Sequence, residues 1–245
     1  MKTIFVTLSL FISINLTAQS PIATHVYPWS SDGKLIFDGS GSVFNKQSLS
    51  GHQLRSGKKL RFNTGTAGAE MFFIIKYGPV SVVLNGAESL LDKGSVVFLL
   101  PGDEVIFRNP RKDPVEIYAM SMSSSVPDYT RGKSAGPSFV MNWFDMTYKP
   151  HDKGGVRQLF DRKTVMMNRF DIHITSLNPG LNSHAPHTHK NEEIILMIDG
   201  EGEMVLGNAK EKIVTGEAAW VESNIPHNIT NTGKRPAVYF AIQWN

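Results

Sequence analysis

The sequence contains the same pattern twice, and this duplication constrains the fold more than any other feature. The stretch from Phe72 to Met120 aligns without a gap to the stretch from Ile194 to Ile242, at a constant offset of 122 positions (194 minus 72). Chance seldom keeps so many turn-forming residues in register, so we infer an ancient duplication into two similar domains. The matched turn residues include Gly78 with Gly200, Gly94 with Gly216, Asn109 with Asn231, and Pro114 with Pro236.

Each copy has the pattern of β-strands. Short runs rich in β-branched and aromatic residues alternate with turns of Gly, Pro, Asn or Asp, and helical periodicity is nearly absent. The sequence therefore predicts an all-β protein made of two small antiparallel barrels or jelly rolls, an architecture whose interior can hold one small ligand. The segment 123–138 is rich in Ser, Gly and Pro and is expected to link a first domain at 21–122 to a second at 139–245.

The N-terminus indicates export. Residues 1–18 combine Lys2, an apolar run from Ile4 to about Leu16 and a small residue at Ala18, which is the pattern of a signal peptide cleaved after Ala18. No later stretch is long and apolar enough for a membrane helix. The 25 basic and 22 acidic residues are interspersed, so we expect neither nucleic acid nor a membrane as partner. The chain has no cysteine, which excludes disulfides and thiolate ligands.

A metal site is indicated by the stretch HAPHTHKNEE, from His184 to Glu193. His187, His189 and Glu193 are separated by two and four positions, so they point to one side if the chain stays extended. His227 can join them from a facing strand. Three imidazoles and one carboxylate suit a single divalent transition metal, and Mn, Fe, Zn, Ni and Cu all remain candidates.

These residues carry a family resemblance. HTHKNEEIILMIDG, from His187, resembles the first cupin motif, and GEAAWVESNIPHNITN, with His227, resembles the second. The chain is thus similar to two-domain cupins, or bicupins, with double-stranded β-helix barrels. The resemblance implies that His187, His189, Glu193 and His227 bind one metal.

The first copy provides an internal comparison. At the offset of 122, the four proposed ligands correspond to residues that cannot bind such a metal, namely Gly65, Ala67, Met71 and Val105. Histidines needed only for the fold would be expected in both copies. We therefore expect the N-terminal domain to be a degenerate cupin without metal, and only the C-terminal domain to bind an ion.

Other residues are weaker candidates. His173, in an alternating strand, is either a catalytic acid or base or a packed histidine. His184 is expected on a rim, either in contact with substrate in the pocket or as a plain surface histidine. Trp220, Phe240 and Gln243 are candidates for lining that pocket, although such aromatic residues are more often core. Glu192 and Asn231 repeat as Glu70 and Asn109 in the metal-free copy, which favours structural roles.

Two classes of function follow. The first is a metal-dependent enzyme that acts on a small oxygen-rich substrate, such as a sugar acid, uronate or ureide, by Lewis-acid or acid-base chemistry, as an isomerase, lyase or hydrolase. The second is a non-catalytic cupin that binds a small ligand or metal, and a cupin dioxygenase is a further alternative. Cupins commonly pair through their sheets, so a homo-oligomer is also expected.

Overall fold

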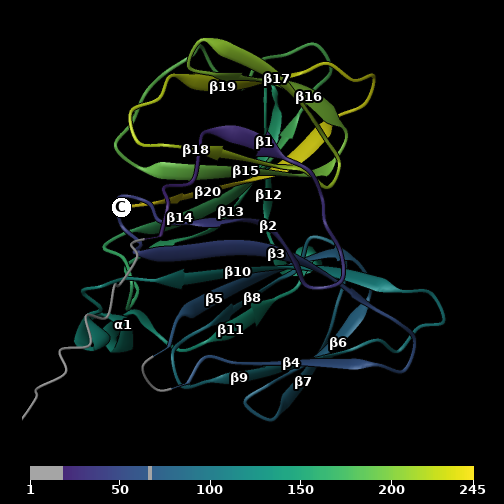
Figure 1. Cartoon of the computed structure of the whole chain (residues 1–245). Helices are drawn as coiled ribbons and strands as arrows, with labels where there is room; N and C mark the ends of the chain where they lie inside the picture. Colours follow the sequence, from purple (N-terminus) through teal and green to yellow (C-terminus); the bar gives the residue numbers. More distant parts are fainter. Residues whose placement is uncertain (1–18, 66–67) are drawn as a thin grey trace, which may run out of the picture.

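The computed structural model describes residues 19–65 and 68–245, and it consists almost entirely of antiparallel strands arranged as two stacked barrels (Figure 1). The predicted signal peptide at residues 1–18 and Ala67 lie outside the described residues. No helix in the described part of the chain is long and apolar enough to cross a membrane.

The strands of the two copies recur at the offset expected from the sequence. β5 begins at Glu70 and β15 at Glu192, again 122 positions apart (192 minus 70). The first copy continues with β6 (Val80–Leu84), β7 (Ala87–Leu91), β8 (Val96–Leu99), β9 (Glu104–Arg108) and β10 (Val115–Ser123), after β5 (Glu70–Tyr77). The second contains β15 (Glu192–Asp199), β16 (Glu201–Leu206), β17 (Ala209–Val214), β18 (Ala218–Val221), β19 (His227–Asn231) and β20 (Ala237–Trp244).

Each barrel has one large and one small sheet. The N-terminal barrel is completed by β2 (Lys34–Gly39), β3 (Lys46–Leu54), β4 (Lys59–Asn63) and β11 (Phe139–Met141). Its sheets have the orders β11-β8-β5-β10-β3-β2 and β4-β9-β6-β7. The C-terminal barrel is completed by β1 (His25–Tyr27), β12 (Tyr148–His151), β13 (Gly154–Arg162) and β14 (Phe170–Leu177). Its sheets have the orders β1-β18-β15-β20-β14-β13-β12 and β17-β16-β19. The predicted all-β class is confirmed.

The barrels exchange edge strands. β1 (His25–Tyr27) pairs with β18 of the C-terminal barrel, and β11 (Phe139–Met141) pairs with β8 of the N-terminal barrel. The exchange is symmetric, because His25 lies opposite Trp220 and Phe139 opposite Phe98, and Trp220 and Phe98 are equivalent positions of the two copies. β1 and β11 therefore lie near the N-terminal end of each half and pair with the barrel of the other half.

The expected linker at 123–138 contains a helix that is fixed to the C-terminal half. α1 (Tyr129–Ala135) is capped by Asp128, whose side chain accepts a hydrogen bond from the Arg131 backbone N–H at 2.8 Å. The Arg131 guanidinium donates to the carbonyls of Thr164 and Val165 at 2.7 and 2.8 Å. A short 3-10 turn, η1 (Trp143–Asp145), follows β11.

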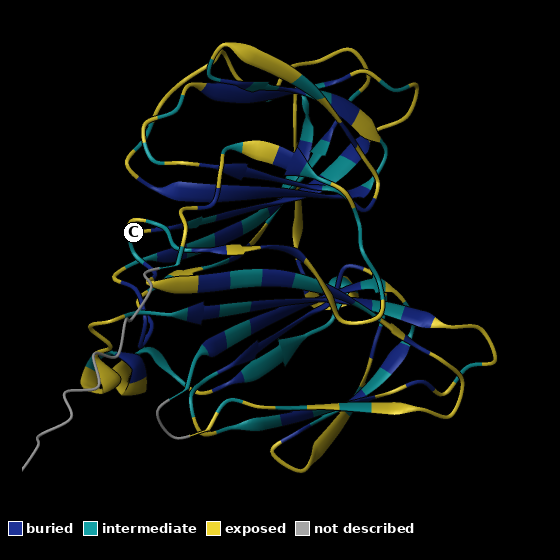
Figure 2. Cartoon of the chain, viewed as in Figure 1, coloured by how far each residue is buried: buried dark blue, intermediate teal, exposed yellow. Residues whose placement is uncertain are grey.

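Alternation along the strands divides the apolar residues between two kinds of core. On β15, Ile194 and Leu196 belong to a cluster between the barrels, whereas Ile195 and Met197 face the barrel interior. The strands that meet between the barrels are largely buried, and the outer hairpins are exposed (Figure 2). A residue's parity on β15 or β20 therefore decides whether it packs between the barrels or lines the interior.

Two equivalent glutamates join the halves reciprocally. Glu70 of the N-terminal barrel accepts a hydrogen bond from Thr164 Oγ1 at 2.6 Å, and Glu192 of the C-terminal barrel accepts one from the Ser42 backbone N–H at 2.6 Å. Burial raises the pKa of the Glu70 carboxyl, and the hydrogen bond from Thr164 counteracts part of that effect. The expected structural role of both glutamates is confirmed.

Asn109 and Asn231 each hold the same turn. The Asn109 amide donates to the Leu54 carbonyl at 2.8 Å, and the Asn231 amide donates to the Leu177 carbonyl at 2.7 Å. Each amide also donates to the carbonyl four residues later, at 2.8 Å. This confirms the prediction that the repeated asparagine fixes a turn.

Replacing either Asn109 or Asn231 with alanine should lower the free energy of unfolding by about 2–3 kcal/mol, because two carbonyls lose their donor and at least one is buried. Denaturant unfolding of both variants checks this, with exposed Asn208→Ala as the control. Stability equal to that of the control in both variants would contradict the role assigned to the amide.

Candidate metal centre

His187 and His227 lie side by side on paired backbone segments. Their residues form an isolated antiparallel bridge, in which each N–H donates to the other's carbonyl at 3.3 and 3.1 Å. Directly opposed residues of a bridge project their side chains to one face, and the two ring centroids are 4.9 Å apart. His227 thus comes from a strand paired with the His187 segment, rather than from one facing it across the barrel.

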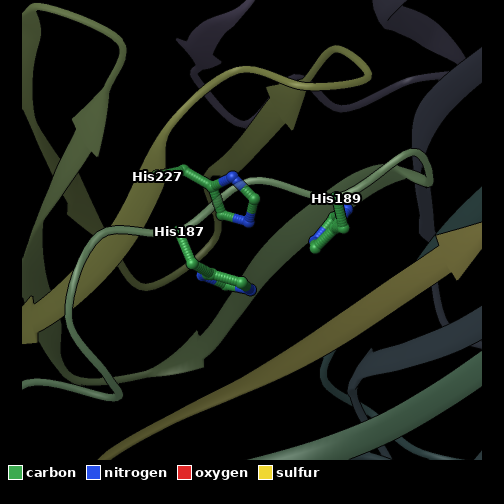
Figure 3. Close-up of side chains that lie close together, drawn as sticks. All are labelled: His187, His189 and His227. Carbon is green, nitrogen blue, oxygen red and sulfur yellow. The ribbon is translucent and has the colours of Figure 1, made fainter.

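His189 and Glu193 complete the group, although the chain between them is not a continuous strand, since β15 begins only at Glu192. The His189 carbonyl accepts a hydrogen bond from the Asn224 N–H at 2.8 Å, which fixes this loop against the turn before β19. The His189 ring centroid lies 5.2 Å from that of His187 and 4.8 Å from that of His227. The three rings converge on one space (Figure 3).

The histidine nitrogens are arranged as potential ligands. One ring nitrogen from each of His187, His189 and His227 lies within 4.8 Å of the others. The Nδ1 atoms of His189 and His227 lie 2.9 and 2.8 Å from the carbonyls of Asn191 and Ile225. Because a carbonyl only accepts, these Nδ1 atoms carry a hydrogen. In the neutral ring Nε2 then has a free lone pair for a metal, and in the protonated ring the same Nε2 presents a hydrogen to Glu193.

The Glu193 carboxylate lies against these free nitrogens. Its Oε2 is 2.9 Å from His227 Nε2 and 3.5 Å from His189 Nε2, and its Oε1 accepts from Gln243 Nε2 at 3.0 Å. Burial alone would raise the pKa of Glu193, but the contacts with His189 and His227 and the hydrogen bond from Gln243 outweigh burial and hold this pKa well below its usual range. Glu193 is therefore a carboxylate at neutral pH.

The donor set fits a metal ion. His189 Nε2 and His227 Nε2 are buried and make no well-formed hydrogen bond in the described part of the chain, although His227 Nε2 is 2.9 Å from Glu193. Two ligands bound about 2.1 Å from a shared ion at right angles lie roughly 3 Å apart, which matches this contact. Three imidazoles and a carboxylate are suitable ligands for Mn, Fe, Zn, Ni or Cu.

The site opens into a cavity. Its volume is about 350 Å³, within the usual range for small-ligand pockets, and His187 at its wall is exposed to solvent. Of the residues predicted near the substrate, His173, His184 and Gln243 line this cavity, and the His184 ring centroid is 4.0 Å from that of His187. Further polar lining residues are His151, Lys153, Thr175, Ser183, Asn228 and Tyr239.

Trp220 and Phe240 do not line the cavity, which corrects the expectation from the sequence. Both are fully buried in the core between the barrels. On β20, Phe240 has the opposite parity to Tyr239 and Gln243, which do face the cavity.

Several cavity residues were not expected from the sequence. Tyr239 could have been found, because it lies four positions before Gln243 on the same strand and so shares its face. His151 and Lys153 lie at the hairpin between β12 and β13, and no local pattern indicates that this hairpin borders the site.

The interior of the N-terminal barrel is filled where the C-terminal barrel is hollow. Phe73 and Phe107 are fully buried with ring centroids 5.0 Å apart, and Phe62 packs on Phe73 at 4.8 Å. The positions equivalent to Phe73 and Phe107 are Ile195 and Ile229, which line the cavity. Larger side chains thus occupy the space that a ligand would need.

Comparisons with known proteins agree with this architecture. Residues 173–243 match the family model described as cupin domain, so the part of the chain that holds the four candidate ligands is a cupin domain. A comparison with curated protein sequences gives no match.

Solved structures with the same fold cover both halves. A putative glyoxylate induced protein from Pseudomonas aeruginosa is 16% identical with a TM-score of 0.68, over 93% of this chain and 84% of that one. A mutant of Bacillus subtilis oxalate decarboxylase is 12% identical with a TM-score of 0.64, over 91% and 78%. A salicylate 1,2-dioxygenase from Pseudaminobacter salicylatoxidans is 11% identical with a TM-score of 0.62, over 80% and 70%. At these identities the likeness shows the cupin fold alone.

Replacing His187 or His227 with alanine should remove most of the bound metal, since each change deletes one nitrogen donor. We expect affinity to fall by more than about 100-fold while the circular dichroism spectrum is retained. Elemental analysis of purified protein measures this, with His25→Ala outside the site as the control. Metal at the control level in both variants would defeat the assignment.

Acid should displace the metal through His189 first. The nearby Glu193 carboxylate raises the pKa of His189, whereas burial lowers the pKa of His187. Because protons compete with metal for the ring nitrogen, metal affinity should increase as pH rises through the raised pKa of His189. At pH values below that pKa, the affinity should decrease. Affinity measured from pH ~5 to ~8 tests this, and a constant value would contradict it.

In the metal-free protein, folding stability should depend on pH with the opposite sign to metal affinity. Protonated His189 beside Glu193 stabilises the fold, and this contribution is fully present below 6.5 and is lost as pH rises through the folded-state pKa.

Proposed function

We propose that the chain is an exported metal-dependent enzyme acting on a small oxygen-rich molecule, of the sugar acid, uronate or ureide type. The observation that carries this proposal is that three of the four candidate ligands, His187, Glu193 and His227, line an open cavity that also contains other polar groups. A site used only to stabilise the fold would be expected to be plugged by apolar side chains, as the equivalent space in the N-terminal barrel is.

The four ligands would hold one divalent transition metal in the C-terminal barrel. Such an ion, when bound, supplies a Lewis acid that polarises a substrate oxygen or lowers the pKa of water. Gln243 contributes by donating to Glu193 Oε1, which orients the carboxylate so that Oε2 faces the histidines.

His173 is the best-placed residue to move a proton. It lies on β14 opposite Ala241 of β20, the strand that also carries Gln243. Its side chain lines the cavity. An imidazole can both accept and donate a proton, which suits a general acid or base. Tyr239 has a different role, because burial raises its pKa to about 12 and keeps its hydroxyl a hydrogen-bond donor at neutral pH.

Export and the enzymatic class are each supported by a separate feature of the chain. Export depends on the signal-like sequence at residues 1–18, and the enzymatic class depends on the cavity chemistry. Acid-base chemistry is favoured over oxygen activation because several proton-exchanging and donor groups line the cavity, namely His151, His173, His184 and Tyr239. A homo-oligomer through sheet contacts is also proposed.

The experiment is elemental analysis of the natively exported protein, followed by turnover assays with sugar acids and ureides and by oxygen-consumption assays with Fe(II). We expect one transition metal per chain, turnover without oxygen uptake, and His173→Gln to lower kcat by about 100-fold or more with metal content unchanged. His25→Ala, outside the cavity, is the matched control. Ligand binding without turnover would support the non-catalytic alternative, and coupled oxygen uptake would support a dioxygenase.

A further inference from the structure

We propose that the cavity selects a hydroxylated carboxylic acid and that Lys153 recognises its carboxylate. This inference rests on the proposed function because it concerns the same cavity. It narrows the oxygen-rich substrates to acids and excludes neutral ureides.

The charges around the cavity favour an anion. Among the described residues that line it, the side chains with a full charge throughout the neutral range are Lys153 and Glu193. The Glu193 carboxylate contacts His227, His189 and Gln243. Its negative charge is therefore directed at the ligand set. Once a divalent ion is bound, the ion and Lys153 together outweigh Glu193, and the cavity has an excess of positive charge. A substrate carboxylate would neutralise that excess.

Lys153 is fixed at the site rather than extended into solvent. Its ammonium donates to the Ser183 carbonyl at 3.0 Å, and its residue is half-buried. Ser183 lies on the loop that leads to His187, so this hydrogen bond ties the ammonium to the segment that carries the ligands. An ammonium has three donors, and two of them remain for a ligand.

The protein does not neutralise this ammonium in the part of the chain that the structure describes. The Ser183 partner is a neutral carbonyl. The adjacent acid, Asp152, has a side chain that is 90% exposed and lies 3.7 Å from His151, and it does not line the cavity. The charge of Lys153 is therefore available to a bound anion.

Asn228 adds a preference for a hydroxyl group. Its amide nitrogen donates to the His184 carbonyl at 3.1 Å, which fixes the orientation of the side chain. Its Oδ1 is buried and has no hydrogen-bond partner among the described residues, although Asn228 lines the cavity. A buried acceptor without a partner costs free energy, and a substrate hydroxyl would satisfy it. Lys153 and Asn228 together thus indicate a hydroxy acid.

The test uses calorimetric binding to the metal-loaded protein, with glucuronate, galacturonate, lactate and malate as probes, each compared with its amide. Wild type should bind at least one acid about tenfold or more tightly than the matching amide. Lys153→Met should remove this preference, mainly by weakening the acid, and Lys153→Arg should retain most of it. Lys149→Met is the matched control, because Lys149 is exposed on the same hairpin and outside the cavity lining.

Equal metal content in all variants ensures that the effect does not arise from loss of the ion. The inference is overturned if no acid binds, if acid and amide bind equally, or if Lys153→Met keeps the wild-type preference. The readout is binding, so it is separate from the proposed activity. Acid binding that depends on Lys153, without turnover, would support this inference and contradict the proposed enzymatic function. Turnover of a neutral ureide by Lys153→Met would support the enzymatic function and contradict this inference.

Discussion

The alternation of side chains on β15 and β20 is the constraint on which the rest of the structure depends. Each strand has one face toward the core between the barrels and the other toward the C-terminal interior. Trp244 belongs to the first face, where its ring lies 5.2 Å from that of Trp220 on β18 of the same sheet. Glu193 and Gln243 meet at 3.0 Å on the second face. A shift of one residue would exchange the two faces, so the packing that joins the halves also fixes the carboxylate beside the histidines.

The two barrels share one backbone fold but differ in their interiors. Both keep the turn asparagine and the glutamate that reaches the opposite half, because these residues stabilise the fold itself. Their interiors differ in side-chain volume: Phe73 and Phe107 fill one, and Ile195 and Ile229 leave space in the other. The exchange of β1 and β11 joins the barrels further, and β1 extends the sheet in which β15 carries Glu193.

Sequence reasoning was most successful where chemistry and periodicity act locally. The spacing of His187, His189 and Glu193, together with the absence of ligands from the first copy, identified side chains that the structure brings together. Phe240 differs in parity from Gln243 on the same strand, and it packs in the core between the barrels rather than at the cavity. Lys153 was missed because its position at the site depends on how the β12–β13 hairpin lies against the histidine loop, a contact between segments 30 positions apart.

The duplication, the all-β class and the set of candidate ligands follow from residue order, because repeats, strand alternation and ligand chemistry are all properties of it. Which faces meet emerged only from the folded structure. It showed the exchange of edge strands, the cavity, and the surroundings of Lys153 and Asn228. The physical reason is that burial, unpaired acceptors and uncompensated charge depend on segments far apart in the chain, and only the packed fold brings those segments together.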